Sequence, residues 1–107
     1  MTTKLPKPPA HLGRSGKRLW RKVVSTFDLD AVALELLATT AAALDRSEQA
    51  REHVTVEGLT VVDRFGQTRP HPLLAVERDS RAQFMAGLRA LALDLEPVGA
   101  IGRPAGR

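Results

Sequence analysis

The sequence has no cysteine and no tyrosine, and only 4% of its residues are aromatic. Without cysteine, neither disulfides nor thiolate metal ligands can form. Proteins that bind RNA or single-stranded DNA commonly stack bases on aromatic side chains, so the low aromatic content argues against both classes. No apolar run approaches membrane-spanning length, and the first residues lack the apolar segment of a signal peptide. We therefore expect a soluble, intracellular protein.

Signatures of catalysis are missing as well. There is no glycine-rich phosphate loop followed by Lys and Ser or Thr, and there is no nucleophile elbow. The histidines are scattered, at His11, His53 and His71. Glu48 and Glu52 lie beside His53, but carboxylates at this spacing are commoner on a solvated helix face, and no second histidine is placed to complete a metal site. We expect a non-enzyme without metal or cofactor.

Acidic residues are absent from positions 1–22, which carry seven basic residues. Positions 23–63 then hold eight acidic residues against Arg46 and Arg51. A basic first part followed by an acidic middle indicates a polyanionic partner for the first part. At 107 residues, the chain is long enough for one domain with a modest core.

Residues 1–14 form a predicted flexible, basic arm, because their three prolines disfavour a helix. Ser15 can cap a first helix that runs to about Thr26. We interpret Trp20, in the apolar stripe of this helix, as a core anchor. The basic residues lie beside or opposite that stripe, either as an ordinary solvated face or as a contact to nucleic acid. The candidate DNA-binding residues are Arg14, Lys17, Arg18, Arg21 and Lys22.

A second helix is predicted to follow a cap at Asp28 or Asp30 and to reach about His53. Apolar residues in its first half spread over more than half of the helical wheel, so we expect it to be covered on two sides and to serve in assembly. Its second half is polar nearly all round and is expected to pack lightly. The candidate oligomer-interface residues are Leu34, Leu37, Ala41 and Leu44, with Glu77 and Arg81 from a third helix.

Residues 57–70 predict a β-hairpin whose turn uses a positive φ at Gly66. A third helix is predicted from Pro72 to about Leu93. Glu77 and Arg81 interrupt its apolar face at i, i+4 spacing, either as a solvated pair or as a pair at a subunit contact. Together these features predict a mainly α fold with three helices and a hairpin between the second and third, in one domain of residues 15–97. Residues 98–107, rich in glycine, form a predicted flexible tail.

Three segments in order, PPAHLGRSGKRLW, LDAVALELLATTAAALDR and EGLTVVDRFGQTRPHPLLAVERDSRAQFMAGLRALALDLEP, make the sequence similar to a known family. It resembles the small terminase subunits of tailed bacteriophages, of the shorter helix–hairpin–helix type, over about residues 8–97. The family often has asparagine where His71 stands, which leaves the cap of the third helix open. It also often has glycine near residues 92–93, which leaves the end of that helix open. The most specific features are Gly58, the hairpin tip at Gly66, the step His71-Pro72 and the leucine-rich helix ending in Leu95-Glu96-Pro97.

The resemblance implies a DNA-packaging adaptor in the cytoplasm of a bacterial host, of phage or prophage origin. Such proteins form rings, bind double-stranded DNA at the packaging start and recruit the large terminase subunit, which holds the ATPase and nuclease. Two alternatives remain open. One is an oligomeric scaffold or antitoxin-like regulator whose basic end binds an acidic protein. The other is a dimeric repressor with a two-fold assembly and a palindromic site.

Overall fold

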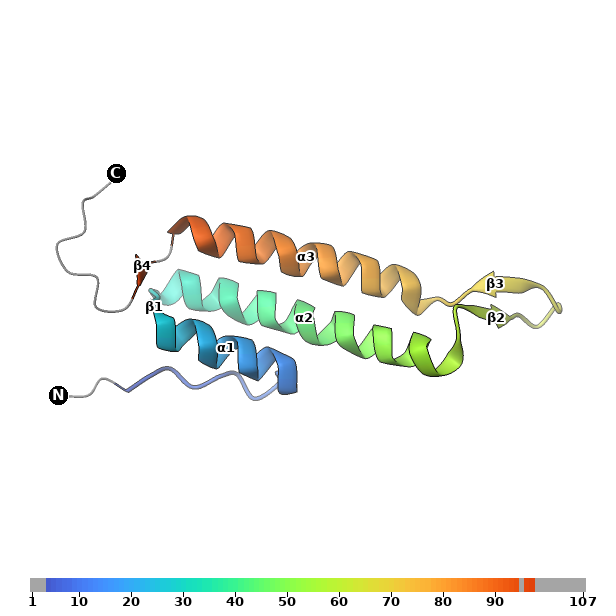
Figure 1. Ribbon diagram of the computed structural model, residues 1–107, viewed down its shortest axis with the longest axis horizontal. Coiled ribbons are helices and arrows are strands. Elements are labelled where there is room, and N and C mark those ends of the chain that lie inside the picture. Colours follow the sequence, from blue (N-terminus) through green and yellow to red (C-terminus); the bar gives the residue numbers. More distant parts are fainter. Residues whose placement is uncertain (1–3, 95, 98–107) are drawn as a thin grey trace.

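The computed structural model describes residues 4–94 and 96–97, so the predicted tail at 98–107 lies outside the described residues. Three helices make up most of the fold: α1 (Arg14–Thr26), α2 (Ala31–Glu57) and α3 (Leu73–Asp94) (Figure 1). Between α2 and α3, strands β2 (Thr60–Val62) and β3 (Thr68–Pro70) pair antiparallel as a hairpin. The predicted mainly α fold, with three helices and a hairpin between the second and third, is confirmed.

The helix ends follow from local chemistry. Asp30 is the cap of α2, because its carboxylate accepts a 2.8 Å hydrogen bond from the N–H of Ala33. Gly58 ends α2 with φ of +95°, a value that glycine adopts without strain. After α1, the extended pair Phe27–Asp28 (β1) pairs antiparallel with Glu96–Pro97 (β4), a pairing that the sequence did not predict.

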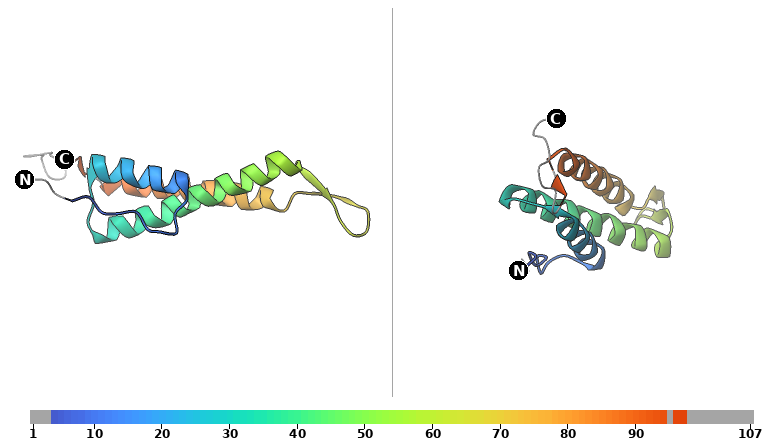
Figure 2. Two further views of the ribbon diagram at one scale, coloured as in Figure 1. Left: turned by 90° about the horizontal axis from the view of Figure 1, so that it is seen from below. Right: turned by 60° about the vertical axis from the view of Figure 1, so that its left-hand side comes forward.

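The helices form two layers of different length. α2 and α3 lie antiparallel, and α1 packs against the first part of α2 (Figures 1 and 2). At about 1.5 Å per residue, α2 is about 40 Å long and α1 about 20 Å, so α1 covers only half of α2. The molecule is elongated, 65 × 29 × 18 Å, with the hairpin projecting from the end that α1 leaves bare.

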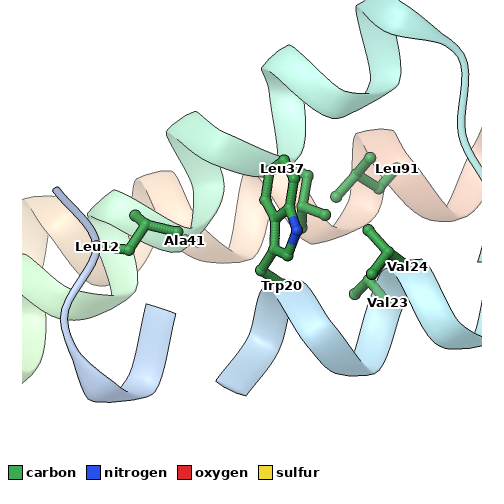
Figure 3. Packing of buried hydrophobic residues seen from close by; sticks show 7 residues of the cluster. All are labelled: Leu12, Trp20, Val23, Val24, Leu37, Ala41 and Leu91. Carbon is green, nitrogen blue, oxygen red and sulfur yellow. The ribbon is translucent and has the colours of Figure 1, made fainter. Parts of the chain in front are cut away.

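The core lies at the three-helix end of the molecule (Figure 3). Trp20 is 4% exposed there, which confirms its predicted role as a core anchor. The wide apolar arc of α2 is covered within one chain, by α1 on one side and α3 on the other. The buried cluster comprises Leu12, Trp20, Val23, Val24, Leu37, Ala41 and Leu91.

The second half of α2 was expected to pack lightly, and this expectation is wrong. Ser47, Ala50 and Val54 are buried along the α2 face that continues past the core. Small side chains let the two long helices approach closely. At Gly87 of α3, a β-carbon would stand 2.1 Å from the hydroxyl oxygen of Thr40. In the described part of the chain, no helix has a stretch both long and apolar enough to cross a bilayer.

Candidate nucleic-acid interface

The five predicted DNA-binding residues lie on one face of α1. At about 100° per residue, Arg14, Lys17, Arg18, Arg21 and Lys22 fall within an arc of about 140°. The buried residues of α1 lie on the opposite side of the helix. Four of the five basic side chains are exposed, and that of Lys17 is half-buried. We call these five residues the basic face.

The basic face has no acidic counterpart on its own surface. Within residues 4–92, the ion pairs lie on α2, α3 and the hairpin, and none includes a residue of the basic face. Lys4 and Lys7 in the preceding arm are also exposed. These cations are therefore available to an external polyanion, where each phosphate contact would release condensed counterions.

The arm at residues 4–13 is held more firmly to the helices than the flexible arm that we predicted from the sequence. It is extended as expected, but the indole N–H of Trp20 donates a 3.0 Å hydrogen bond to the carbonyl oxygen of Pro6. Leu12, at the other end of the arm, is buried in the core. These two anchors hold residues 6–12 against the helical body, which keeps Lys7 close to α1.

Asp45 of α2 fixes the start of α1. Its carboxylate accepts hydrogen bonds from the N–H of Gly13 at 2.6 Å and from the N–H of Gly16 at 2.7 Å. The predicted cap, Ser15, is wrong, because its hydroxyl donates instead to Glu48 at 2.5 Å. Since Asp45 already occupies the positive end of the helix, an external polyanion would meet the side chains of the basic face and not the helix N-terminus.

Gly16 allows this contact by its lack of a side chain. A β-carbon there would lie 2.2 Å from the Asp45 carboxylate and 3.0 Å from the carbonyl oxygen of Ala41. Neither Gly16 nor Asp45 was predicted from the sequence to have this role. The two residues are 29 positions apart, and no local pattern links a carboxylate on one helix with the first amides of another.

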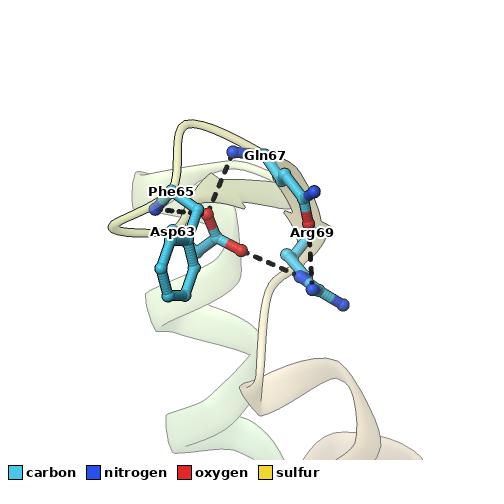
Figure 4. Close-up of polar contacts among 4 residues, drawn as sticks. All are labelled: Asp63, Phe65, Gln67 and Arg69. Atoms are coloured by element: carbon cyan, nitrogen blue, oxygen red, sulfur yellow. Dashed lines mark hydrogen bonds and ion pairs between the residues drawn. The ribbon is translucent and has the colours of Figure 1, made fainter.

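The hairpin tip is organised by Asp63 (Figure 4). Its Oδ1 accepts hydrogen bonds from the N–H groups of Phe65 and Gln67, both at 2.9 Å, and its Oδ2 accepts one from Arg69 at 3.0 Å. The hydrogen bond from Gln67, and then that from Arg69, hold the pKa of Asp63 below its usual value. The predicted positive φ at Gly66 is confirmed, at +79°.

This arrangement leaves one cation free at the tip. The charge of Arg69 is balanced by Asp63, whereas the guanidinium of Arg64 lies over the ring of Phe65, 5.1 Å from its centroid. No ion pair within residues 4–92 includes Arg64. The hairpin thus adds a single unbalanced charge and much exposed apolar surface, in contrast to the basic face.

The six predicted oligomer-interface residues are divided by the structure. Leu37 and Ala41 are 0% exposed in the core of one chain, so their assignment to a contact between copies is corrected. Leu34 is half-buried beside the same core. The other three, Leu44, Glu77 and Arg81, come together in a groove between α2 and α3. We call it the α2–α3 groove; it has a volume of about 480 Å³ and is lined by Leu44, Ser47, Glu48, Arg51, Glu77, Arg81, Phe84 and Met85.

His71 joins the hairpin to α3. It is 5% exposed, and its Nδ1 accepts a 3.0 Å hydrogen bond from the N–H of Leu73, so it caps α3. Its Nε2 lies 2.6 Å from Glu57, which requires the proton on Nε2 for both bonds to form. Hydrogen bonds from His71, and then from His53, lower the pKa of Glu57. Among the described side chains, no group of three or more ligands is placed to hold a metal.

Comparison with models of known families, with curated proteins and with solved structures gave no match for this chain.

Proposed function

We propose that this protein is the small terminase subunit of a tailed bacteriophage or prophage, a ring-forming adaptor in DNA packaging. In this proposal it binds double-stranded viral DNA, and it recruits and regulates the large terminase subunit in the bacterial cytoplasm. The large subunit supplies the ATPase and nuclease, and the small subunit performs no catalysis itself. The order of the helices and hairpin in the sequence supports the assignment through its resemblance to that family.

The observation that carries the proposal is the basic face of α1. Four of its five cations are exposed, none of the five has an ion-pair partner among residues 4–92, and they lie on a helix anchored by Trp20 and Asp45. Long flexible cations on a rigid support suit contact with phosphates, which positions a protein on DNA without reading its sequence. We therefore expect weak sequence preference for each subunit, and selectivity from several subunits that engage repeated or bent DNA.

A salt titration of DNA binding tests this function. Replacing Arg18, Arg21 and Lys22 together with alanine should weaken binding to duplex DNA. The slope of log K against log salt should fall by up to about 0.9 for each phosphate that the variant no longer neutralises. The assembly mass should remain that of the wild type, because all three side chains are exposed.

A matched control removes three charges elsewhere. Arg46, Arg78 and Arg89 lie on α2 and α3 and are exposed, so their replacement with alanine changes the net charge equally. This control should keep most of the salt dependence of the wild type. A wild-type slope in the α1 variant would contradict DNA binding by the basic face. Equal losses in both variants would assign the binding to net charge alone. A two-fold assembly in place of a ring would favour the repressor.

A further inference from the structure

Exposed apolar side chains gather at the end of α2 and on the hairpin that follows it. Of the seven large apolar side chains exposed within residues 4–92, four lie between positions 56 and 65: Val56 on α2, and Leu59, Val62 and Phe65 in or beside the hairpin. Phe65, at the tip, is 73% exposed. β2 and β3 make their main contacts with each other, and a two-stranded hairpin alone is only marginally stable in water. These apolar side chains are therefore left in contact with solvent, although burial against another surface would stabilise them.

The α2–α3 groove is the complementary feature. The first turn of α1 reaches along α2 as far as Asp45 and Glu48, which accept its hydrogen bonds. Beside this junction, the groove has an apolar lining from Leu44, Phe84 and Met85 and a charged rim. Met85 is 47% exposed and is a fifth member of the exposed apolar set.

The hairpin and the groove of one chain are kept apart. The hairpin projects away from the helices along the long axis of the molecule (Figure 1). The groove is lined by residues 44–51 of α2 and 77–85 of α3, which lie near the middle of these helices.

The groove rim carries two acidic and two basic residues, of which Glu77 and Arg81 pair with each other. Glu48 and Arg51 on the rim, and Arg64 at the hairpin tip, enter no ion pair among residues 4–92. The carboxylate of Glu48 is therefore a possible partner for Arg64, provided that Arg64 enters on the side of the rim away from Arg51.

We propose that the hairpin of one copy docks in the α2–α3 groove of the next copy, with Phe65 and its neighbours against the groove's apolar lining and Arg64 near Glu48. The contact joins two different surfaces of the chain, so it is heterologous. Repeated from copy to copy, such a contact closes a ring when the rotation between neighbouring copies divides a full turn. This inference rests on the proposed function in one respect, because it names the contact that would build the proposed ring. No residue of the basic face takes part in this contact.

Complementary variants distinguish this contact from any other. Phe65→Asp disables the hairpin and leaves the groove intact, whereas Met85→Asp disables the groove and leaves the hairpin intact. Both side chains are exposed, so both variants should keep the helix content of the wild type. Each variant alone should be monomeric. An equimolar mixture should give a dimer of the two, because one intact hairpin can still enter one intact groove.

The measurement is native mass spectrometry of the full chain without DNA, with circular dichroism as the check on folding. Val32→Asp, a change at an exposed valine near the start of α2, is the control and should keep the wild-type mass. Assembly by either variant alone, or a mixture that stays monomeric, overturns the docking. If the wild type assembles by another route, the proposed function survives. A monomeric wild type rejects both the docking and the ring.

Discussion

At the tip of the hairpin, three hydrogen bonds converge on the carboxylate of Asp63. Two come from main-chain N–H groups within the turn, and the third comes from Arg69 on the opposite strand. A neutral carboxylic acid would accept these hydrogen bonds more weakly, so the conformation of the loop depends on the ionised form of Asp63. Because Asp63 also sets the direction of the tip, its ionisation bears on how Phe65 and Arg64 are presented.

We predict that the tip loses its order only in strong acid. Hydrogen bonds lower the pKa of Asp63, so its contribution to stability is present above the unfolded value of about 3.9 and is lost as the pH falls through the lower folded value. The amide resonances of Phe65 and Gln67, followed by NMR across this range, should titrate with a midpoint below about 3.9. Asp63→Asn should abolish the titration. A midpoint at or above the unfolded value in the wild type would show that the carboxylate is not held in this way.

At the scale of single residues, the sequence was most informative where the cause is local. Gly66 could be predicted because a tight turn needs a positive φ, and the structure has it. His71 could not be predicted as the cap of α3, because its role requires one ring nitrogen near Leu73 and the other near Glu57. Glu57 is 14 positions away, on another element, and that proximity arises only when the hairpin closes.

At the scale of elements, α1 depends on α2 for the partners of its first amides. Asp45→Ala should leave the N–H groups of Gly13 and Gly16 without their acceptor and destabilise the fold by about 1–3 kcal/mol. The destabilisation should appear as a lower midpoint in urea and as faster hydrogen exchange at the start of α1. DNA affinity should fall with it, because the basic face would be less firmly held.

Asp30→Ala is the matched control for this change. Asp30 also caps a helix, but it does so locally, at the start of α2. Its replacement should lower stability by about 0.5–2 kcal/mol and should leave hydrogen exchange in α1 unchanged. If Asp45→Ala behaves in the same way, with α1 still protected, then Asp45 does not hold α1 in place.

The elements themselves were largely predictable, and their packing partners were not. Helical periodicity placed all three helices, Asp30 was correctly offered as a cap of α2, and the turn signal at Gly66 placed the hairpin. The apolar arc of α2 was also interpreted correctly as needing cover on two sides, but periodicity does not say which chain supplies it. Leu37 and Ala41 are covered by the chain's own α1 and α3. Ser47 and Ala50 were overlooked as buried positions because small side chains carry little hydrophobic signal.

At the scale of the whole molecule, stability and exposed apolar surface lie at opposite ends. The buried cluster unites α1, α2 and α3 at one end. The hairpin at the other end contributes none of that cluster, although it and the chain that leads into it from α2 carry four of the seven large apolar side chains exposed within residues 4–92. This separation fits a protein whose body folds on its own and whose hairpin is stabilised by contact with another copy.

Shortening the hairpin tests this separation. Thr60 and Pro70 are paired across the hairpin, so residues 61–69 can be replaced by Asn-Gly, a pair that suits a two-residue turn. The contact between His71 and Glu57 lies outside the deleted segment and should persist. The free energy of unfolding should change by less than about 0.5 kcal/mol, as for surface changes away from the core, whereas assembly should be abolished.

A core variant provides the opposite case. Leu91→Ala should lower the free energy of unfolding by about 2–5 kcal/mol, because Leu91 is 3% exposed within the buried cluster. Urea unfolding and native mass spectrometry, applied to both variants, give the two readouts. Below its unfolding midpoint, Leu91→Ala should still assemble, since its hairpin and α2–α3 groove are intact. A shortened hairpin that unfolds as easily as Leu91→Ala would show that the hairpin stabilises the monomer. A shortened hairpin that keeps the wild-type mass would show that the copies meet elsewhere, and the search for their contact would then move to Leu34 and the remaining surface of α2.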